Sequence, residues 1–155
     1  MKALRIYIAG PISKGDLLHN VKQSDAAFER LAKAGLAPFN PMWSVYAGGA
    51  VAHRFPGDLA EINAVGTRMS RLAFTHAEWL RVDLPWVEAS HAVLRLPGES
   101  TGADRETTHA RQHGIPVFED IAELEAWAVT RSIFDAQMER DFTEGFYRNL
   151  ATGGK

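Results

Sequence analysis

The sequence contains no cysteine. Disulfide bonds, thiolate zinc sites, iron–sulfur clusters and a cysteine nucleophile are therefore excluded. A chain without cysteine fits the reducing cytoplasm, and we expect the protein to work there.

Long apolar runs are also missing. No stretch reaches the roughly 20 residues that a membrane-spanning helix needs, and Met1–Gly10 lacks the longer apolar core and cleavage site of a signal peptide. We therefore expect no membrane association.

Neither sign of charge is in large excess. Lys and Arg total 17, Asp and Glu total 19, and the formal net charge is -2. Such a surface offers no basic field for duplex nucleic acid, although a few directed groups can still hold a small phosphorylated ligand. The signatures GxxxxGK[ST] and GxGxxG are absent as well, which argues against a Walker-type NTPase and a dinucleotide dehydrogenase.

The 155 residues show a regular alternation of predicted strands and helices. We expect them to form one domain, 1–155. The predicted strands are Ala3–Ala9, Leu36–Phe39, Ala92–Leu96 and Ile115–Phe118. The predicted helices are Asn20–Ala34, His76–Ser90 with an interruption near Asp83-Leu84-Pro85, Gly102–His113, Ile121–Ala128 and Ser132–Leu150. This pattern predicts a three-layer α/β fold, flavodoxin- or Rossmann-like, with a mostly parallel sheet of four to five strands, helices on both faces and extra C-terminal helices.

The stretch Met42–Thr75 is less regular. It contains Gly and Pro pairs and several aromatics, with one short helix predicted at Leu59–Val65. A long irregular stretch in a small domain is typical of a binding loop or lid.

Two loops follow predicted strands at the edge where α/β proteins bind ligands. They are residues 10–15 (GPISKG) and 97–102 (PGESTG), and the second opens a helix. Small residues and a helix N-terminus favour an anion, but each loop alone is equally typical of a plain turn with a capping Ser or Thr.

Two carboxylates are candidates for this edge. Glu106 is expected in the first turn of the helix after the second loop, and Asp83 precedes the helix that leads into the third strand. Paired carboxylates suit glycosidic bond cleavage, where one attacks or stabilises the sugar and the other handles a proton. The alternatives are a helix-dipole carboxylate for Glu106 and an N-cap for Asp83.

Glu106, His109 and His113 share a helical face that suits a metal, but carboxylate-bridged metal sites of this type need further glutamates from other helices. We therefore predict a solvated or interface histidine pair, with no metal and no cofactor. An apolar stripe follows at Phe134, Met138, Phe142, Phe146 and Leu150. It is expected to pack on the domain's own sheet or on a second subunit, and the chain is predicted to form a homodimer or higher homo-oligomer.

Three short segments carry a shared pattern: residues 5–11 (RIYIAGP), 83–91 (DLPWVEASH, against D-L-x-x-[ILVW]-x-x-[AS]-D), and 100–106 (STGADRE, against S-x-G-x-x-x-E). Together these segments resemble the nucleoside 2-deoxyribosyltransferase superfamily. Asn40-Pro41, Leu96-Pro97-Gly98 and Gly114-Ile115-Pro116-Val117 fit a phage-associated branch, and the 2′-deoxynucleoside 5′-phosphate N-hydrolases are also similar. The resemblance covers residues 3–13, 36–41 and 79–118.

The resemblance implies a role for each matching residue. Glu106 would be the nucleophile, Asp83 the proton carrier, and Tyr7 would orient Glu106 or help to bind the sugar. A glutamate at a helix N-terminus is expected to stay ionised and nucleophilic. Substrate contacts are expected from Gly10, Pro11, Ile12, Ser13, Asn40, Trp43, Tyr46, Ser100 and Gly102, with Phe74 and Trp79 as further base-stacking candidates.

Two positions depart from the family pattern. His91 stands where the family has Asp, and Asp104 is an extra carboxylate expected to repel a phosphate or raise the pKa of Glu106. The resemblance implies cleavage or transfer at the N-glycosidic bond of a (deoxy)nucleoside or its 5′-monophosphate. The alternatives are a non-catalytic nucleotide sensor of the same fold, or a structural subunit that acts through its C-terminal helix.

Overall fold

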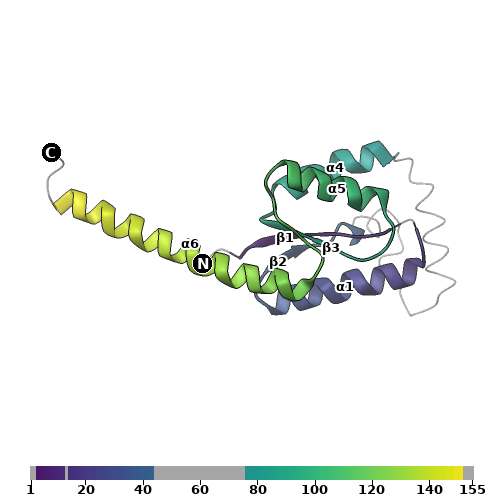
Figure 1. The fold of residues 1–155 in the computed structure, drawn as a ribbon, viewed down its shortest axis with the longest axis horizontal. Coiled ribbons are helices and arrows are strands. Elements are labelled where there is room, and N and C mark those ends of the chain that lie inside the picture. Colours follow the sequence, from purple (N-terminus) through teal and green to yellow (C-terminus); the bar gives the residue numbers. More distant parts are fainter. Residues whose placement is uncertain (1–2, 13, 44–75, 152–155) are drawn as a thin grey trace.

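The structure of the chain is a computed structural model, which describes residues 3–12, 14–43 and 76–151. Its centre is a parallel sheet with strand order β2-β1-β3-β4 (Figure 1). The strands are β1 (Arg5–Ala9), β2 (Ala37–Phe39), β3 (Ala92–Arg95) and β4 (Val117–Phe118). The predicted α/β class and parallel sheet are confirmed within the described residues.

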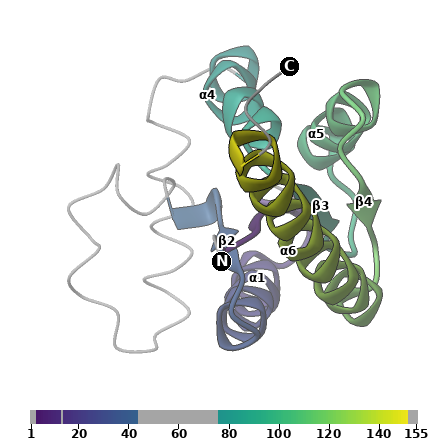
Figure 2. The same ribbon diagram turned by 90° about the vertical axis from the view of Figure 1, so that its left-hand side faces the viewer.

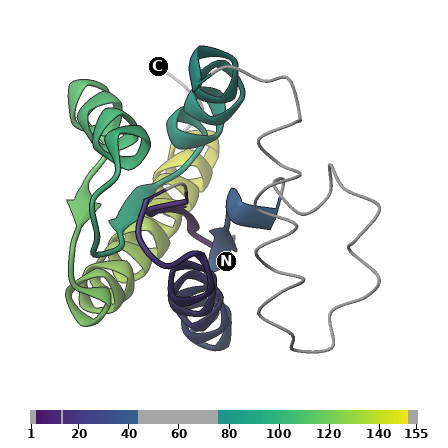
Figure 3. The same cartoon turned by 90° about the vertical axis from the view of Figure 1, so that its right-hand side faces the viewer.

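Helices cover both faces of the sheet. They are α1 (Leu17–Lys33), α4 (His76–Glu88), α5 (Thr101–Gln112) and α6 (Ile121–Ala151). Figures 2 and 3 show α4 and α5 beside each other, across the strands from α1. The chain moves from β1 to β2 on one side and to β3 on the other, so the strand order reverses at β1 and β3. Ligands of doubly wound folds bind beyond the carboxyl ends of the strands at such a switch point.

Strand β1 divides its side chains between the two faces. Ile6 and Ile8 join an aliphatic core with Leu31 of α1 and Leu124 of α6. Tyr7 and its neighbours pack instead against α4 and α5. This division follows from the two-residue period of a strand, which sends successive side chains to opposite faces.

Helix α4 runs through Pro85 without a break, so the predicted interruption at Asp83-Leu84-Pro85 is wrong. A proline inside a helix leaves the carbonyl four residues earlier without its usual donor. Here that carbonyl belongs to Arg81, and both Arg81 and Pro85 are exposed. Water can therefore hydrate the Arg81 carbonyl, which lowers the cost of having Pro85 inside the helix.

Helix α6 is also continuous, whereas the sequence predicts two helices separated at residues 129–131. Val129, Thr130 and Arg131 include no Gly or Pro, and Thr130 donates its hydroxyl to the Ala126 carbonyl at 3.1 Å. β-branched residues lower helix propensity by only a fraction of a kcal/mol, about 0.7 at most. Nothing in this segment therefore breaks the helix.

The distal part of α6 extends away from the sheet (Figure 1). Phe134, Met138 and Phe142 are 58%, 55% and 76% exposed. The expectation that the stripe packs on the domain's own sheet is therefore wrong for these three residues. The side chains of Phe146 and Leu150 lie outside the described residues, as does the predicted helix Leu59–Val65. None of the helices in the described ranges has the length and apolar character to cross a membrane.

Candidate active site

The central feature of the site is a buried hydrogen bond between Tyr7 and Glu106. The Tyr7 hydroxyl donates to Glu106 Oε1 at 2.9 Å, and the two residues are 0% and 7% exposed. Tyr7 comes from the middle of β1 and Glu106 from α5. Two residues 99 positions apart in sequence are therefore brought together under α5.

Glu106 lies in the second turn of α5, not in the first as predicted, because the helix begins at Thr101 after the N-cap Ser100. Glu106 is also less readily ionised than a position near a helix N-terminus predicts. Burial is the main cause that raises the pKa of Glu106 from 4.5 to about 7. The Tyr7 hydrogen bond and the charge of Arg95 act in the opposite direction, because both favour the ionised carboxylate.

Asp83 is the second buried carboxyl group of this region. It lies inside α4, so the alternative that it caps a helix before Pro85 is excluded. It is 9% exposed, and burial raises the pKa of Asp83 to about 6. Its charge raises the pKa of both Tyr7 and Glu106, so the three groups form one electrostatically coupled cluster. Burial is the largest cause of the raised pKa of Tyr7, which therefore remains a neutral donor.

Asp104 does not act on Glu106 as expected. Its carboxylate accepts a hydrogen bond from Arg95 Nη2 at 2.9 Å and is 64% exposed. The carboxylate that raises the pKa of Glu106 is Asp83. The ion pair with Arg95 explains how this additional acid is accommodated at the start of α5.

The two predicted loops lie side by side at the carboxyl edge. Gly98 has a φ of +116°, and a Cβ at this position would lie 2.9 Å from Pro11 Cγ. Lys14 forms an ion pair with Glu99, and the amide of Gln23 donates to the Pro97 carbonyl at 3.0 Å. Close backbone approach at Gly98 therefore brings the segment after β3 against the segment after β1, at the switch point of the sheet.

The predicted contacts in these loops have different environments. Gly10 is half-buried, Pro11 is buried and Ile12 is half-buried, whereas Ser13 lies outside the described residues. Ser100 Oγ accepts a hydrogen bond from Ala103 N at 3.2 Å, as an N-cap does, and Gly102 lies in the first turn. Contacts of these residues with a substrate remain predictions.

Asn40 and Trp43 are engaged with α1. Asn40 is 2% exposed, donates to Ser24 Oγ at 3.2 Å and accepts from Met42 N at 3.1 Å. Trp43 donates to Asp25 Oδ1 at 3.2 Å, and its ring lies 4.2 Å from that of Phe28 between centroids. The structure thus gives both residues a packing role, and their contact with a substrate stays a prediction. Tyr46 and Phe74 lie outside the described residues, whereas Trp79 is half-buried in α4.

Sequence reasoning missed two aromatic residues beside Tyr7. The Phe39 ring lies 5.8 Å from the Tyr7 ring and stacks on Trp86 at 4.9 Å with an interplanar angle of 17°. Trp86 is 51% exposed, so these rings lead from the surface to the buried tyrosine. The available signal was the spacing of Trp86, which follows Asp83 by three residues and therefore lies near it on a helix.

Arg95 was missed as well. It is the last residue of β3, its side chain is 13% exposed, and it donates to the carbonyls of Leu96 and Gly98. It therefore fixes the loop after β3 and supplies positive charge near Glu106. A charged residue at the carboxyl end of a buried strand was the signal for it.

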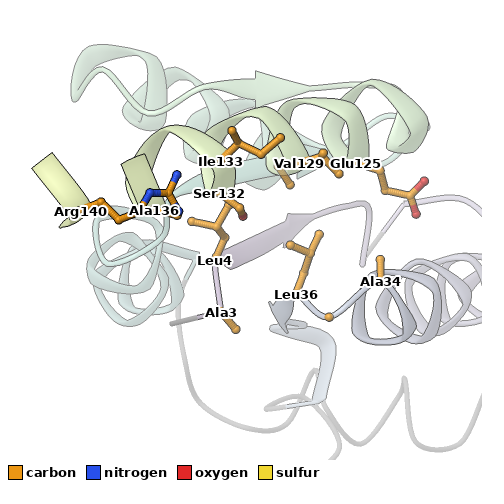
Figure 4. Close-up of a pocket in the computed structure, with 12 residues that line it drawn as sticks. Ala3, Leu4, Ala34, Leu36, Glu125, Val129, Ser132, Ile133, Ala136 and Arg140 are labelled. Atoms are coloured by element: carbon orange, nitrogen blue, oxygen red, sulfur yellow. The ribbon is translucent and has the colours of Figure 1, made fainter. Parts of the chain in front are cut away.

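A cavity of about 750 Å³ lies elsewhere in the molecule, between α6 and the segments that precede β1 and β2 (Figure 4). Leu4, Leu36, Val129 and Ile133 are among its lining residues. It opens near the amino end of β1, so it is separate from the carboxyl edge that carries the two loops.

The fold and the site together define a doubly wound α/β protein with a buried tyrosine–glutamate pair near its switch point. No protein-family model matches the chain, and no curated protein sequence matches it. Among solved structures, the chain is similar to a 2-deoxyribosyltransferase from the psychrotolerant bacterium Bacillus psychrosaccharolyticus. The identity is 17%, the TM-score is 0.47, and the match covers 78% of this chain and 90% of the other.

Proposed function

We propose that the protein cleaves or transfers at the N-glycosidic bond of a (deoxy)nucleoside or its 5′-monophosphate, through a covalent glycosyl–Glu106 intermediate. The observation that carries this proposal is the buried hydrogen bond from Tyr7 to Glu106 beside Asp83. Retaining glycosyl transfer uses two carboxyl groups in one region. The active form here has Glu106 ionised and Asp83 protonated, and it is a minority of the protein because the pKa of Glu106 lies above that of Asp83.

In the first step, an ionised oxygen of Glu106 bonds to C1′ of the sugar, and the C1′–N bond breaks. The electron pair of that bond stays on the base nitrogen, and Asp83 donates its proton to the departing base. In the second step, water or another base attacks C1′, Glu106 leaves as a carboxylate, and Asp83 takes up the acceptor's proton. Water as the acceptor makes the enzyme a hydrolase, and a base makes it a transferase.

Tyr7 has a positioning role in this scheme. Its hydroxyl donates to one oxygen of Glu106, which directs the carboxylate and favours its ionised form. Because Tyr7 is itself neutral, it does not add a competing negative charge. The stacked pair Phe39 and Trp86 offers a flat apolar surface for the base, since aromatic rings stack on any purine or pyrimidine.

The adjoining loops would hold the sugar and its 5′ end. Residues 10–12 and the N-cap region of α5 offer backbone amides and small side chains, and Lys14 is a cation at the same edge. We therefore assign the predicted contacts of Gly10, Pro11, Ile12, Ser100 and Gly102 to the sugar side of the site.

The experiment that tests the proposal follows base release from deoxynucleosides and deoxynucleoside 5′-monophosphates, with and without a free acceptor base. Quenched samples are also weighed by intact-protein mass spectrometry. We expect base release and a sugar adduct in the wild type, and loss of both in Glu106→Gln. Because the pKa of Asp83 is about 6 and that of Glu106 about 7, kcat/KM should be highest between these two values.

The matched control is Glu123→Gln, which removes an exposed carboxylate in the first turn of α6 and should leave both signals unchanged. The products distinguish the two acceptors, since hydrolysis gives free sugar and transfer gives a new nucleoside. Absence of base release from every substrate by folded wild-type protein would contradict the proposal. Ligand binding that survives in both wild type and Glu106→Gln without any turnover would favour the sensor alternative.

We further propose that the active protein is a homo-oligomer joined through α6. Val129 and Ile133 line the cavity beside α6 and are 62% and 64% exposed, and the exposed Phe134, Met138 and Phe142 continue along the same helix. A second copy of this stripe is an apolar surface of matching chemistry. Phe134→Glu should lower the mass measured by light scattering, whereas an unchanged mass would exclude this surface as the contact.

A further inference from the structure

A cluster of two histidines and one glutamate lies at the C-terminal ends of α4 and α5, outside the Tyr7–Glu106 pair. Glu88 is the last residue of α4, His109 lies in the last turn of α5, and His113 is the C-cap of α5. Glu88 Oε1 lies 2.8 Å from His109 Nε2 and 3.9 Å from His113 Nε2. One ligand atom from each residue lies within 4.8 Å of the others.

The sequence suggested a different third member for this cluster. Glu106 shares a helical face with both histidines, but its carboxylate bonds to Tyr7 on the sheet side. Glu88 from the neighbouring helix takes the place beside the histidines instead.

The geometry of the cluster suits a tetrahedral ion. Zinc with ligands at about 2.0–2.2 Å places neighbouring ligand atoms roughly 3.4 Å apart. The two separations from Glu88 Oε1, 2.8 and 3.9 Å, bracket that value. Small side-chain rotations are therefore enough to accommodate the ion, and the exposure of His113 and Glu88 leaves room for a water ligand.

The orientation of His113 provides a second, independent argument. Its Nδ1 lies 2.9 Å from the His109 carbonyl oxygen, which can only accept a hydrogen bond. Nδ1 therefore carries the hydrogen, and in the neutral ring Nε2 presents its lone pair toward Glu88. Metal-binding histidines are commonly fixed in this way, by a backbone carbonyl that accepts from the other ring nitrogen.

We propose that Glu88, His109 and His113 form a binding site for a divalent transition-metal ion, with Zn²⁺ as the best match for two imidazoles and one carboxylate. Two nitrogens and one oxygen favour zinc over calcium or magnesium, which prefer oxygen ligands alone. The ion links α4 to α5. These helices carry Asp83 and Glu106, so binding at their far ends stabilises the pairing of the two elements that hold the buried carboxyl groups.

The test is calorimetric titration of the full chain, purified without a histidine tag and freed of metal by a chelator, with zinc chloride alone. We expect one equivalent of zinc to bind to the wild type. The variants His109→Ala and His113→Ala should each weaken zinc binding by at least about tenfold. Replacing a residue that only supports a metal ligand already costs about that much affinity, so loss of a ligand should cost no less. The matched control His19→Ala removes an exposed histidine of α1 and should bind zinc as the wild type does.

Thermal unfolding supplies a readout that does not depend on activity. Zinc should raise the Tm of the wild type and of His19→Ala, but not that of the double variant His109→Ala/His113→Ala. Equal melting temperatures of all five proteins in chelator would show that the variants fold. The proposal is overturned if the wild type takes up no zinc, or if the double variant binds it with unchanged affinity.

Discussion

The two faces of the sheet are covered by different kinds of buried side chain. Toward α1 and α6, strand β1 presents Ile6 and Ile8, and the core there is aliphatic. Toward α4 and α5, the same strand presents Tyr7, which is bonded to Glu106 near Asp83. One face therefore gains stability from apolar burial, whereas the other buries groups that would be better hydrated.

The raised pKa values indicate that burying the carboxyl groups of the polar face costs free energy of folding. Burial shifts Glu106 to about 7 and Asp83 to about 6, and each shift is free energy by which folding disfavours the ionised form. A buried carboxyl group with a raised pKa and a specific hydrogen-bond partner, such as Glu106 with Tyr7, is typical of a functional site. The difference between the faces therefore supports the chemical role proposed for Tyr7, Asp83 and Glu106.

The largest effect is expected on the aliphatic face. Ile8 is 1% exposed, so Ile8→Ala removes buried methyl groups and leaves a cavity between the sheet and α1. We expect a loss of about 4 kcal/mol in the free energy of unfolding. Chemical denaturation at pH 7 measures it, with Ile8→Val as the conservative variant at about 1 kcal/mol. A loss for Ile8→Ala no larger than that for Ile8→Val would mean that this face is loosely packed.

The opposite sign is expected for Glu106→Gln. The pKa of Glu106 rises from 4.5 to about 7 on folding, so the destabilisation is absent below pH 4.5, grows as the pH rises toward 7, and is complete above that. The amide keeps an oxygen for the Tyr7 hydroxyl and cannot ionise. We expect Glu106→Gln to be more stable than the wild type by about 3 kcal/mol at pH 8.

The pH dependence is the control for this prediction. At pH 4 the wild-type carboxyl is protonated, so the advantage of Glu106→Gln should disappear there. Denaturation curves at pH 4 and pH 8 measure both values, and Glu123→Gln on the exposed side of α6 should differ from the wild type at neither pH. An equal gain at both pH values would assign the effect to packing rather than to ionisation.

The sequence predicted the aliphatic face better than the polar one. The apolar run of residues 3–9 and the helical spacing of Leu31 led to the correct parallel sheet and helix, because burial is periodic and local. Two boundaries were wrong for the same reason. Local propensity predicts breaks at Pro85 and at residues 129–131, whereas the exposure of Pro85 and the lack of any breaker at 129–131 let both helices continue.

At the site, the residues were easier to predict than their ionisation. The motif resemblance points to Tyr7, Asp83 and Glu106, and the structure brings these three residues into one coupled cluster, while their catalytic roles stay predictions. The pKa of Glu106 could not be inferred, because it depends on burial under α5 and on a bond to a residue 99 positions away. Phe39 and Arg95 were missed because their importance arises only from neighbours on other strands and helices.

A smaller effect is expected from replacing Arg95, whose positive charge acts on Glu106. Arg95→Gln removes a guanidinium that donates to the Gly98 carbonyl and lowers the pKa of Glu106. We expect a loss of about 1.5 kcal/mol and a pKa of Glu106 above its wild-type value. Denaturation and NMR titration of the Glu106 carboxyl carbon measure the two changes. Asp104→Asn removes the partner of Arg95 but keeps the guanidinium, so it should not raise the pKa. A rise in that variant would contradict the role given to Arg95.

The smallest effect on stability is expected at Tyr7, although the residue is fully buried. Tyr7→Phe keeps the ring beside Phe39 and removes only the hydroxyl that donates to Glu106. The net value of such a hydrogen bond is about 1 kcal/mol. Because the bond favours the ionised carboxylate, its loss should raise the pKa of Glu106 and cost more stability at pH 8 than at pH 5. It should also lower kcat/KM between pH 6 and 7, where less Glu106 would be ionised.

A double-mutant cycle of Tyr7→Phe with Glu106→Gln, measured by denaturation at both pH values, isolates the coupling between the two side chains. The coupling should be larger at pH 8, where Glu106 of the wild type is ionised. Equal coupling at the two pH values would mean that Tyr7 positions Glu106 without selecting its charge. In that case the ionisation of Glu106 would be controlled by burial and by the charges of Asp83 and Arg95, without a contribution from Tyr7.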